Sequence, residues 1–143
     1  MKKQKEKISV LYIDDEINAL NSFKANFKNE YDIHLAQSAK EAKEMLEKKS
    51  FHIIIADQKM PDMTGIDFFE SIIFHYHDPI RILMTGYNEI DVVIEAINRA
   101  HVFRYVLKTW NEKDLKMKIN DAFELYQLRK QNKEEFNKLI RPS

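Results

Sequence analysis

Residues 10–16 read VLYIDDE, an apolar run that ends in three consecutive carboxylates. The run belongs to a segment, residues 8–13, that is short and apolar enough to form a buried strand. The residues after it repeat large apolar side chains at the spacing of one helix face, namely Ile17, Leu20, Phe23 and Phe27. A buried strand that leads directly into an amphipathic helix is the first unit of an α/β fold.

Four further strand-then-helix units follow along the chain. Apolar runs predict strands at residues 32–36, 51–56, 80–84 and 102–107. Helical spacing predicts helices at 38–49, 66–75, 89–100 and from residue 112 onward, with capping residues at Ser38 and Asn111. The runs at 53–56 and 82–84 lack polar alternation, which indicates cover on both faces. We therefore predict a doubly wound α/β fold, a five-stranded parallel sheet with five helices.

The composition is that of one globular domain. The chain has 143 residues, of which 44% are hydrophobic and 32% are charged. The 23 basic and 23 acidic residues cancel, so no charge excess points to nucleic acid or a membrane surface. Cysteine is absent, which excludes disulfides and thiolate chemistry. The basic residues 1–7 precede an apolar run of only about six residues, too short for a signal peptide or a membrane span. We expect a cytoplasmic protein.

The chain becomes polar from about residue 127, where it reads QLRKQNKEEFNKLIRPS. We expect the chain to divide into a folded domain at residues 1–126 and a helical tail or linker at 127–143 that extends the last helix. The tail carries only a broken apolar stripe, formed by Leu125, Leu128, Phe136 and Leu139. That stripe fits either a frayed linker helix or a dimerising coiled coil, so a homodimer stays open.

Charged and polar residues follow four of the five predicted strands. Asp14 and Asp15 follow the first strand, Asp57 the third, Thr85 the fourth and Lys108 the fifth. Ligands of doubly wound sheets bind outside the carboxyl ends of the strands. We therefore expect these side chains to meet at one edge of the sheet.

Such a group of carboxylates needs a counter-charge. Two carboxylates about 4 Å apart repel each other by about 4 kcal/mol at an effective dielectric constant near 20. Lys108 can neutralise one charge, and a hard divalent ion such as Mg²⁺ suits the remaining oxygen ligands. An aspartate beside Mg²⁺ and a lysine is a carboxylate nucleophile for a phosphoryl group. The alternative is that Asp14 and Asp15 only cap the first helix.

From about residue 8 to residue 126, the chain resembles the receiver domains of two-component response regulators. The resemblance rests on DDE at 14–16, DQKMPDMTG at 57–65, MTGY at 84–87 and YVLK at 105–108. It implies a flavodoxin-like sheet with strand order 2-1-3-4-5. It also implies a signalling switch, not an enzyme.

The resemblance assigns the phosphorylation chemistry to particular residues. Asp57 would accept a phosphoryl group from a partner histidine kinase or phosphotransfer protein. Mg²⁺ would be held by Asp57, by Asp15 directly, by Asp14 through water and by the backbone carbonyl of Lys59.

The resemblance also implies how the signal leaves the site. Lys108 would pair with Asp57 and later with the phosphoryl oxygens, Thr85 would bond the phosphoryl group, and Tyr105 would swing inward. The face formed by the helix at 89–100, the strand at 102–107 and the last helix would then signal to a downstream effector domain or protein. Plainer roles remain for Tyr105 as a core residue and for Thr85 as a passive hydroxyl.

One position departs from the family pattern. In the family, proline usually follows the lysine, and the bond between them is cis; here Thr109 follows Lys108. A cis bond before a residue other than proline costs about 3–4 kcal/mol. Either the fold bears that strain, or the bond is trans and the lysine approaches Asp57 differently.

A finer resemblance concerns residues 96–111, AINRAHVFRYVLKTWN. This segment is similar to receivers fused to enzymatic outputs, including HD-GYP cyclic-dinucleotide phosphodiesterases, which usually carry KPWN here. Whether the chain stands alone or was excised from a longer protein stays open. Two alternative functions are a Mg²⁺-dependent phosphohydrolase with an aspartate nucleophile and a receiver-like interaction module that is not phosphorylated. The phosphohydrolase is disfavoured because a D-x-D motif is missing after the first strand.

Overall fold

The protein is described by a computed structural model that covers residues 7–140, apart from the side chains of Tyr87 and Ile90. The described residues leave out 1–6, at the start of the predicted domain, and 141–143, at the end of the predicted tail. Five parallel strands form one sheet in the order β2-β1-β3-β4-β5. The strands are β1 Ser9–Ile13, β2 Asp32–Ala36, β3 Ile53–Asp57, β4 Ile80–Thr85 and β5 Arg104–Leu107. The predicted fold and strand order are confirmed.

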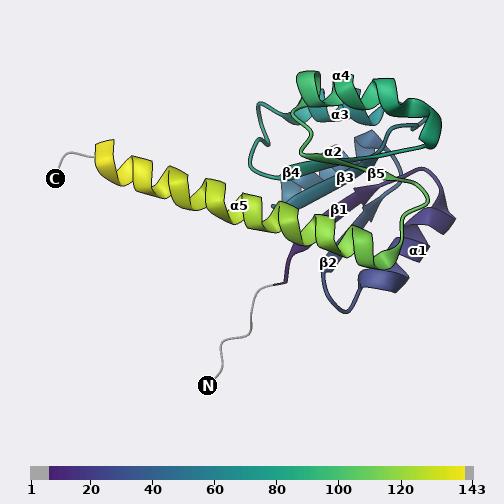
Figure 1. Cartoon of the computed structure of the whole chain (residues 1–143), viewed down its shortest axis with the longest axis horizontal. Coiled ribbons are helices and arrows are strands. Elements are labelled where there is room, and N and C mark those ends of the chain that lie inside the picture. The colour runs from purple at the N-terminus through teal and green to yellow at the C-terminus, as the bar shows by residue number, and fades with distance from the viewer. Residues whose placement is uncertain (1–6, 141–143) are drawn as a thin grey trace.

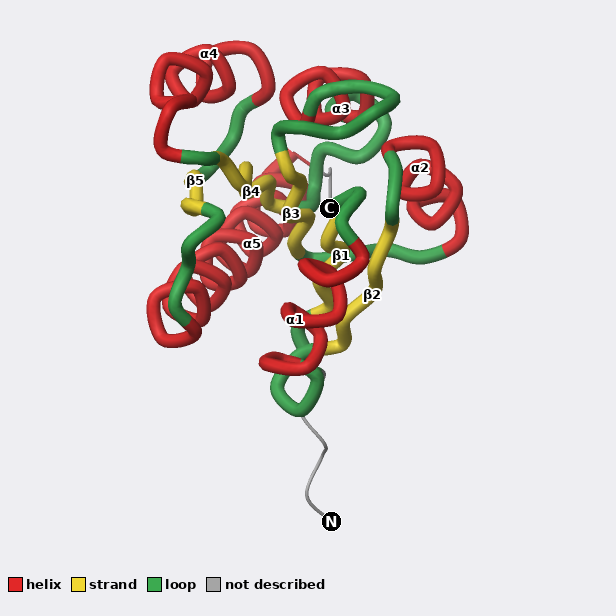
Figure 2. Tube along the Cα trace, turned by 90° about the vertical axis from the view of Figure 1, so that its right-hand side faces the viewer, coloured by secondary structure: helices red, strands yellow, loops and turns green. Residues whose placement is uncertain are grey.

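Five helices cover the two faces of this sheet (Figure 2). They are α1 Ile17–Phe27, α2 Ala39–Lys48, α3 Gly65–Ile72, α4 Ile90–Ala100 and α5 Glu112–Ile140, with a short 3₁₀ turn, η1 Tyr87–Glu89, before α4. Helices α2, α3 and α4 pack on one face around Leu11, Ile54 and Leu83. Helices α1 and α5 pack on the other face around Tyr12 and Ile55. Both faces are buried, which explains the apolar runs in the central strands.

Most element boundaries differ from the predicted ones by one or two residues, and α3 differs most. It ends at Ile72 and not near residue 75. The carbonyl of Ile72 accepts hydrogen bonds from both His75 and Tyr76, so the chain leaves the helix through a turn. The predicted caps are present: Ser38 Oγ accepts from the N–H of Glu41, and Asn111 Oδ1 accepts from the N–H of Asp114.

Helix α5 extends well beyond the part that packs on the sheet. Only its first half packs on the sheet, through Leu115, Ile119 and Ala122. The second half projects away from the other elements (Figure 1). Among residues 7–140, no helix combines the length and apolar character required to cross a membrane.

Arg81 of β4 is a buried arginine that ties the start of its strand to the end of α4. Its guanidinium donates to the backbone carbonyls of Ala100 at 3.1 Å, Pro79 at 2.9 Å and His77 at 3.3 Å. Burial, with a smaller effect of Arg129, lowers the pKa of Arg81 to about 10. The side chain therefore replaces water as the partner of these carbonyls.

We expect Arg81→Met to lower the free energy of unfolding by about 2 kcal/mol, because buried carbonyls lose their donors. Urea denaturation measures the change. Arg104→Met is the matched control on the neighbouring strand, since Arg104 is exposed and its Nη2 lies 3.5 Å from Asp121. The control should change stability by less than about 1 kcal/mol. Equal losses for both variants would contradict the structural role of Arg81.

Candidate functional site

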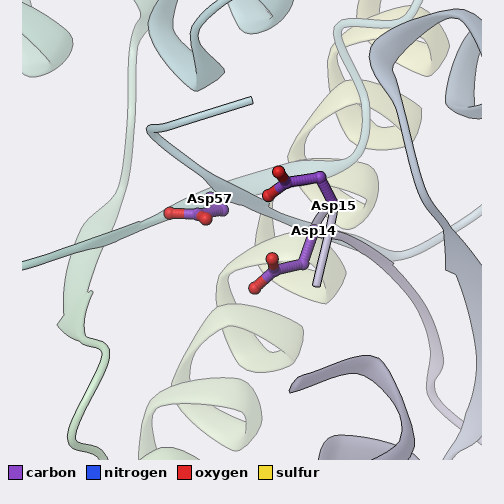
Figure 3. A group of neighbouring side chains, drawn as sticks. All are labelled: Asp14, Asp15 and Asp57. Carbon is purple, nitrogen blue, oxygen red and sulfur yellow. The ribbon is translucent and has the colours of Figure 1, made fainter. Parts of the chain in front are cut away.

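Three aspartates meet at the carboxyl ends of the two central strands. Asp14 and Asp15 follow β1, and Asp57 is the last residue of β3. One carboxylate oxygen from each lies within 4.8 Å of the others. Figure 3 shows Asp14 and Asp15 side by side, with the carboxylate of Asp57 next to them. The strand order brings them together, because β1 and β3 are hydrogen-bonded neighbours.

Asp14 is held in place by hydrogen bonds and is 3% exposed. Its Oδ2 accepts from the hydroxyl of Tyr12 at 2.6 Å, and its Oδ1 accepts from the N–H of Glu16 at 3.0 Å. Burial and the bond to Asp14 raise the pKa of Tyr12 far above its ordinary value. Tyr12 was missed by the sequence reasoning, although residues two apart on a strand share one face. The alternative that Asp14 and Asp15 only cap the first helix is not what the structure shows. The N-cap residue of α1 is Glu16, and its side chain makes no cap hydrogen bond.

Asp57 is almost fully buried and has one cationic partner. Nζ of Lys108 lies 3.1 Å from Oδ1 of Asp57, and the N–H of Lys59 donates to the same oxygen at 3.4 Å. Burial and the charge of Asp14 nevertheless raise the pKa of Asp57 to about 6, against the opposing effect of Lys108. The three carboxylates therefore carry more negative charge than Lys108 compensates.

Lys108 reaches Asp57 without a cis bond. No cis peptide occurs within residues 7–140, so the Lys108–Thr109 bond is trans. The N–H of Lys108 donates to the carbonyl of Thr85 at 2.9 Å, which continues the β4–β5 pairing to the end of the strands. This pairing directs the lysine to the edge where the aspartates lie.

Thr85 and Tyr105 lie on the same face of the sheet, on adjacent strands, but differ in burial. Thr85 is the last residue of β4 and is 1% exposed. Tyr105, on the edge strand β5, is 45% exposed. Tyr105 therefore does not belong to the core, which was the plainer of its two predicted roles.

An ion pair joins the two loops beside the acceptor. Nζ of Lys59, in the β3–α3 loop, lies 3.3 Å from Oε1 of Glu89 in η1. The other oxygen of Glu89 accepts from the N–H of Gly86 at 3.2 Å. The sequence reasoning missed Glu89, because the pairing depends on how the 3₁₀ turn folds back on the loop.

Gly65 lets α3 begin directly against the strand that carries the acceptor. A Cβ at this position would lie 2.7 Å from the carbonyl oxygen of Asp57 and 2.8 Å from Cδ1 of Leu83. Both distances are too short for real contacts, and one partner is backbone that cannot move without displacing Asp57.

We expect Gly65→Ala to lower the free energy of unfolding by about 1 to 3 kcal/mol, because the strand or the helix must shift. Gly86→Ala is the matched control, since no atom lies within 4 Å of a Cβ built there. The control should stay within about 0.5 kcal/mol of the parent chain. Urea denaturation of both variants measures this difference, and similar stabilities would contradict the close approach at Gly65.

The donor set suits a hard divalent cation. Three carboxylates offer oxygen ligands within 4.8 Å of one another, and two of them are buried. Mg²⁺ takes oxygen ligands and uses only one or two carboxylates together with water. The residues thus fit the metal that the sequence predicts, with Asp14, Asp15 and Asp57 as the groups that would hold it.

Comparison with known proteins agrees with this geometry. A family model described as the response regulator receiver domain matches residues 10–120. The hydrogenase transcriptional regulatory protein HoxA of Bradyrhizobium diazoefficiens is 28% identical over 123 residues, which make up 86% of this chain and 25% of that protein. The chain spans about a quarter of the length of the curated relatives it matches.

Many solved structures share the fold, and two of them illustrate the likeness. The beryllofluoride-activated receiver domain dimer of NtrC4 is 28% identical, with a TM-score of 0.77, and the match covers 82% of this chain and 98% of that one. The receiver domain of an HD domain-containing protein from Pseudomonas fluorescens is 23% identical, with a TM-score of 0.84 and coverage of 92% and 97%. The second likeness shows the fold alone, so the similarity to receivers of HD-GYP proteins stays a prediction.

Proposed function

This chain belongs to the response regulator receiver domain family, and we propose that it is a phosphorylation-dependent signalling switch with Asp57 as its phosphoryl acceptor. The observation that carries the proposal is the arrangement around Asp57. This buried carboxylate has Lys108 Nζ at 3.1 Å and two further aspartates within reach of a shared ion. A nucleophile, a fixed cation and a metal-ligand set are the parts that phosphoryl transfer to a carboxylate needs.

In the proposed reaction, a carboxylate oxygen of Asp57 forms a bond to phosphorus as the phosphorus–nitrogen bond of a phosphohistidine donor breaks. The electron pair of that bond stays on the donor's nitrogen. Asp57 is turned toward the edge of the sheet by its place at the end of β3. Lys108 exchanges a carboxylate partner for a phosphoryl oxygen, so its ammonium keeps a counter-ion before and after transfer.

The metal ligands are proposed from the same residues. Asp57, Asp15 and the backbone carbonyl of Lys59 would hold Mg²⁺ directly, and Asp14 would act through water. The bound ion would neutralise phosphoryl oxygens as negative charge approaches an already acidic site. Asp14 is oriented for this role by the hydroxyl of Tyr12 and the N–H of Glu16.

The proposed output is a change at the surface formed by α4, β5 and α5, which we call the signalling face. Thr85 ends the strand beside Asp57, and its hydroxyl is the proposed bond donor to the phosphoryl group. Tyr105 is the proposed reporter, because its half-exposed ring lies on β5, the strand next to Thr85, and would turn inward when Thr85 moves. Ile94 and Ile97 of α4 are exposed on this face and offer apolar contacts to an effector.

The wider assignment follows from the family. We propose a histidine kinase or phosphotransfer protein as donor, and a downstream effector domain or protein as the receiver of the signal. A second copy of the chain is a further proposed partner, supported by the dimer of the related NtrC4 receiver. We place the protein in the cytoplasm, as a switch and not as an enzyme with a diffusible substrate. Residues 1–126 would form the receiver and 127–143 the tail.

Hydrogen exchange with beryllofluoride and Mg²⁺ tests the switch. Beryllofluoride stands in for a phosphoryl group on a carboxylate, so the exchange of α4, β5 and the start of α5 should change on its addition. Asp57→Asn removes the carboxylate oxygen that would bind beryllofluoride and should abolish the change. Asp62→Asn, in the β3–α3 loop, should keep it. An unchanged exchange pattern in the parent chain would contradict the proposal. Repeated turnover of phosphate esters would favour the phosphohydrolase alternative.

A further inference from the structure

The projecting half of α5 carries large apolar side chains that nothing in the described chain covers. Leu128, Phe136 and Leu139 are 50%, 62% and 84% exposed. Together with the half-buried Leu125 they form what we call the tail stripe. Three exposed large apolar residues on one side of about four turns of helix are typical of a surface that binds another protein.

The tail stripe does not continue the face by which α5 packs on its own sheet. At about 100° of rotation per residue, the stripe is turned by roughly 110° from the face of Leu115, Ile119 and Ala122. Tyr126 and Lys130 continue the sheet-facing side instead, since they lie close to that direction. The core of the same chain covers part of Leu125, at the start of the stripe, and leaves Leu128, Phe136 and Leu139 exposed.

The spacing within the tail stripe is regular. Leu125 and Leu128 recur eleven positions later as Phe136 and Leu139, with Asn132 between them on the same line. An eleven-residue repeat has about 3.67 residues per turn, which keeps its stripe nearly straight along a helix. A single asparagine in an otherwise apolar helix seam is a device that fixes register and number of strands.

Charged residues flank the tail stripe with a different sign on each side. Glu124 and Glu135 lie on one flank, and Arg129 and Lys133 lie on the other. None of these four side chains makes an ion pair within residues 7–140. Arg129 and Lys133 are also like charges one turn apart, an unfavourable arrangement in a lone helix. Both flanks therefore lack counter-charges that a partner would supply.

The signs of the flanks select the partner and its direction. When two identical helices pair in parallel about a twofold axis, the acidic flank of each faces the basic flank of the other. When they pair in antiparallel fashion, acidic faces acidic and basic faces basic. Charges beside the seam set the orientation of coiled coils in this way. A second copy in parallel satisfies both the apolar and the charged parts of this surface.

We propose that the tail of α5 forms a parallel two-stranded coiled coil with the tail of a second copy, through the tail stripe and with Asn132 at its centre. This inference refines the homodimer named in the proposed function, and it does not depend on phosphoryl transfer to Asp57. Met117 and Asp121 lie on the same side of α5 as the stripe, so paired tails bring the two signalling faces near each other. The seam is short, so the dimer dissociates on dilution.

Sedimentation of the full chain from about 1 µM to about 1 mM tests the dimer. The parent chain should change from monomer to dimer within this range. Leu128→Glu/Phe136→Glu should remain monomeric at the concentrations where the parent chain is dimeric. Gln127→Glu/Asn137→Glu is the matched control, with the same change in charge one residue away and on the back of the helix. A parent chain that stays monomeric, or a control that dissociates equally, would overturn the proposal.

Charge reversal tests which flanks meet. Arg129→Glu/Lys133→Glu makes both flanks acidic and should weaken the dimer at least tenfold. The further substitution of Glu124→Lys/Glu135→Lys restores one acidic and one basic flank and should restore the dimer. If the variant with all four substitutions dimerises no more tightly than the double variant, the parallel arrangement is wrong.

Cross-linking tests the orientation directly, since the chain has no cysteine of its own. Leu128→Cys places identical thiols opposite each other in a parallel pair and should form a disulfide-linked dimer on mild oxidation. In an antiparallel pair centred on Asn132 these thiols are far apart, so a lack of cross-linking would contradict the proposal. Asp57→Asn should dimerise like the parent chain without any phosphodonor, which separates this inference from the phosphorylation switch.

Discussion

Addition of Mg²⁺ should raise the free energy of unfolding by about 2.7 kcal/mol when the free ion is at about 100 times its Kd. The reason is the acidic cluster, in which carboxylate oxygens of Asp14, Asp15 and Asp57 lie within 4.8 Å of one another. In the folded chain a divalent ion relieves their repulsion, and in the unfolded chain no such cluster exists to bind it. Thermal or urea unfolding at increasing Mg²⁺, with ionic strength held constant, measures the effect.

Two variants at adjacent positions test whether the stabilisation comes from Mg²⁺ bound at this cluster. Asp15→Asn removes one member of the cluster and should lower the affinity for Mg²⁺ at least tenfold. Glu16→Gln removes the next carboxylate along the chain, which lies outside the cluster, and should leave the affinity unchanged. Stabilisation of all three chains to the same extent would mean that the ion acts elsewhere.

Asp57→Asn should raise the free energy of unfolding at pH 7, without divalent ions, by roughly 2 kcal/mol. Burial and Asp14 raise the pKa of Asp57 to about 6, so the ionised carboxylate is unfavourable in the folded chain. Below about pH 4 the group is protonated in both states and costs nothing. The penalty grows as the pH rises from about 4 to about 6 and is complete above that range. The advantage of the variant should follow the same course.

Asp62→Asn is the control, and its effect should have the opposite sign. The carboxylate of Asp62 accepts from the N–H groups of Lys40 at 3.1 Å and Ala39 at 3.3 Å, at the start of α2. Although burial acts against them, these hydrogen bonds lower the pKa of Asp62. Its substitution should therefore reduce stability at pH 7. A loss of stability in Asp57→Asn as well would contradict the charge penalty at the acceptor.

The fold was predictable because its signals are local. The run at 53–56 has no polar residue, and the capping residues Ser38 and Asn111 are directly followed by helices. The place of Asp14, Asp57 and Lys108 was predictable for a related reason. In a parallel sheet the residue at the end of each strand falls on one edge, whatever the details of the loops.

The features that could not be predicted depend on packing between distant segments. Glu89 meets Lys59 only because η1 turns back over the β3–α3 loop. Arg81 is charged but buried, since three backbone carbonyls surround it, and no spacing rule signals that arrangement. The trans bond at Lys108–Thr109 could not be deduced either, because both isomers were compatible with a lysine near Asp57.

The mass of the intact chain after incubation with Mg²⁺ and a small-molecule phosphodonor tests the central claim most directly. We expect the gain of one phosphoryl group on the parent chain, mapped to Asp57. The gain should be lost in Asp57→Asn and when a chelator removes Mg²⁺, and it should persist in Asp62→Asn. A parent chain of unchanged mass, or an equal gain in Asp57→Asn, would contradict the assignment of Asp57 as the phosphoryl acceptor.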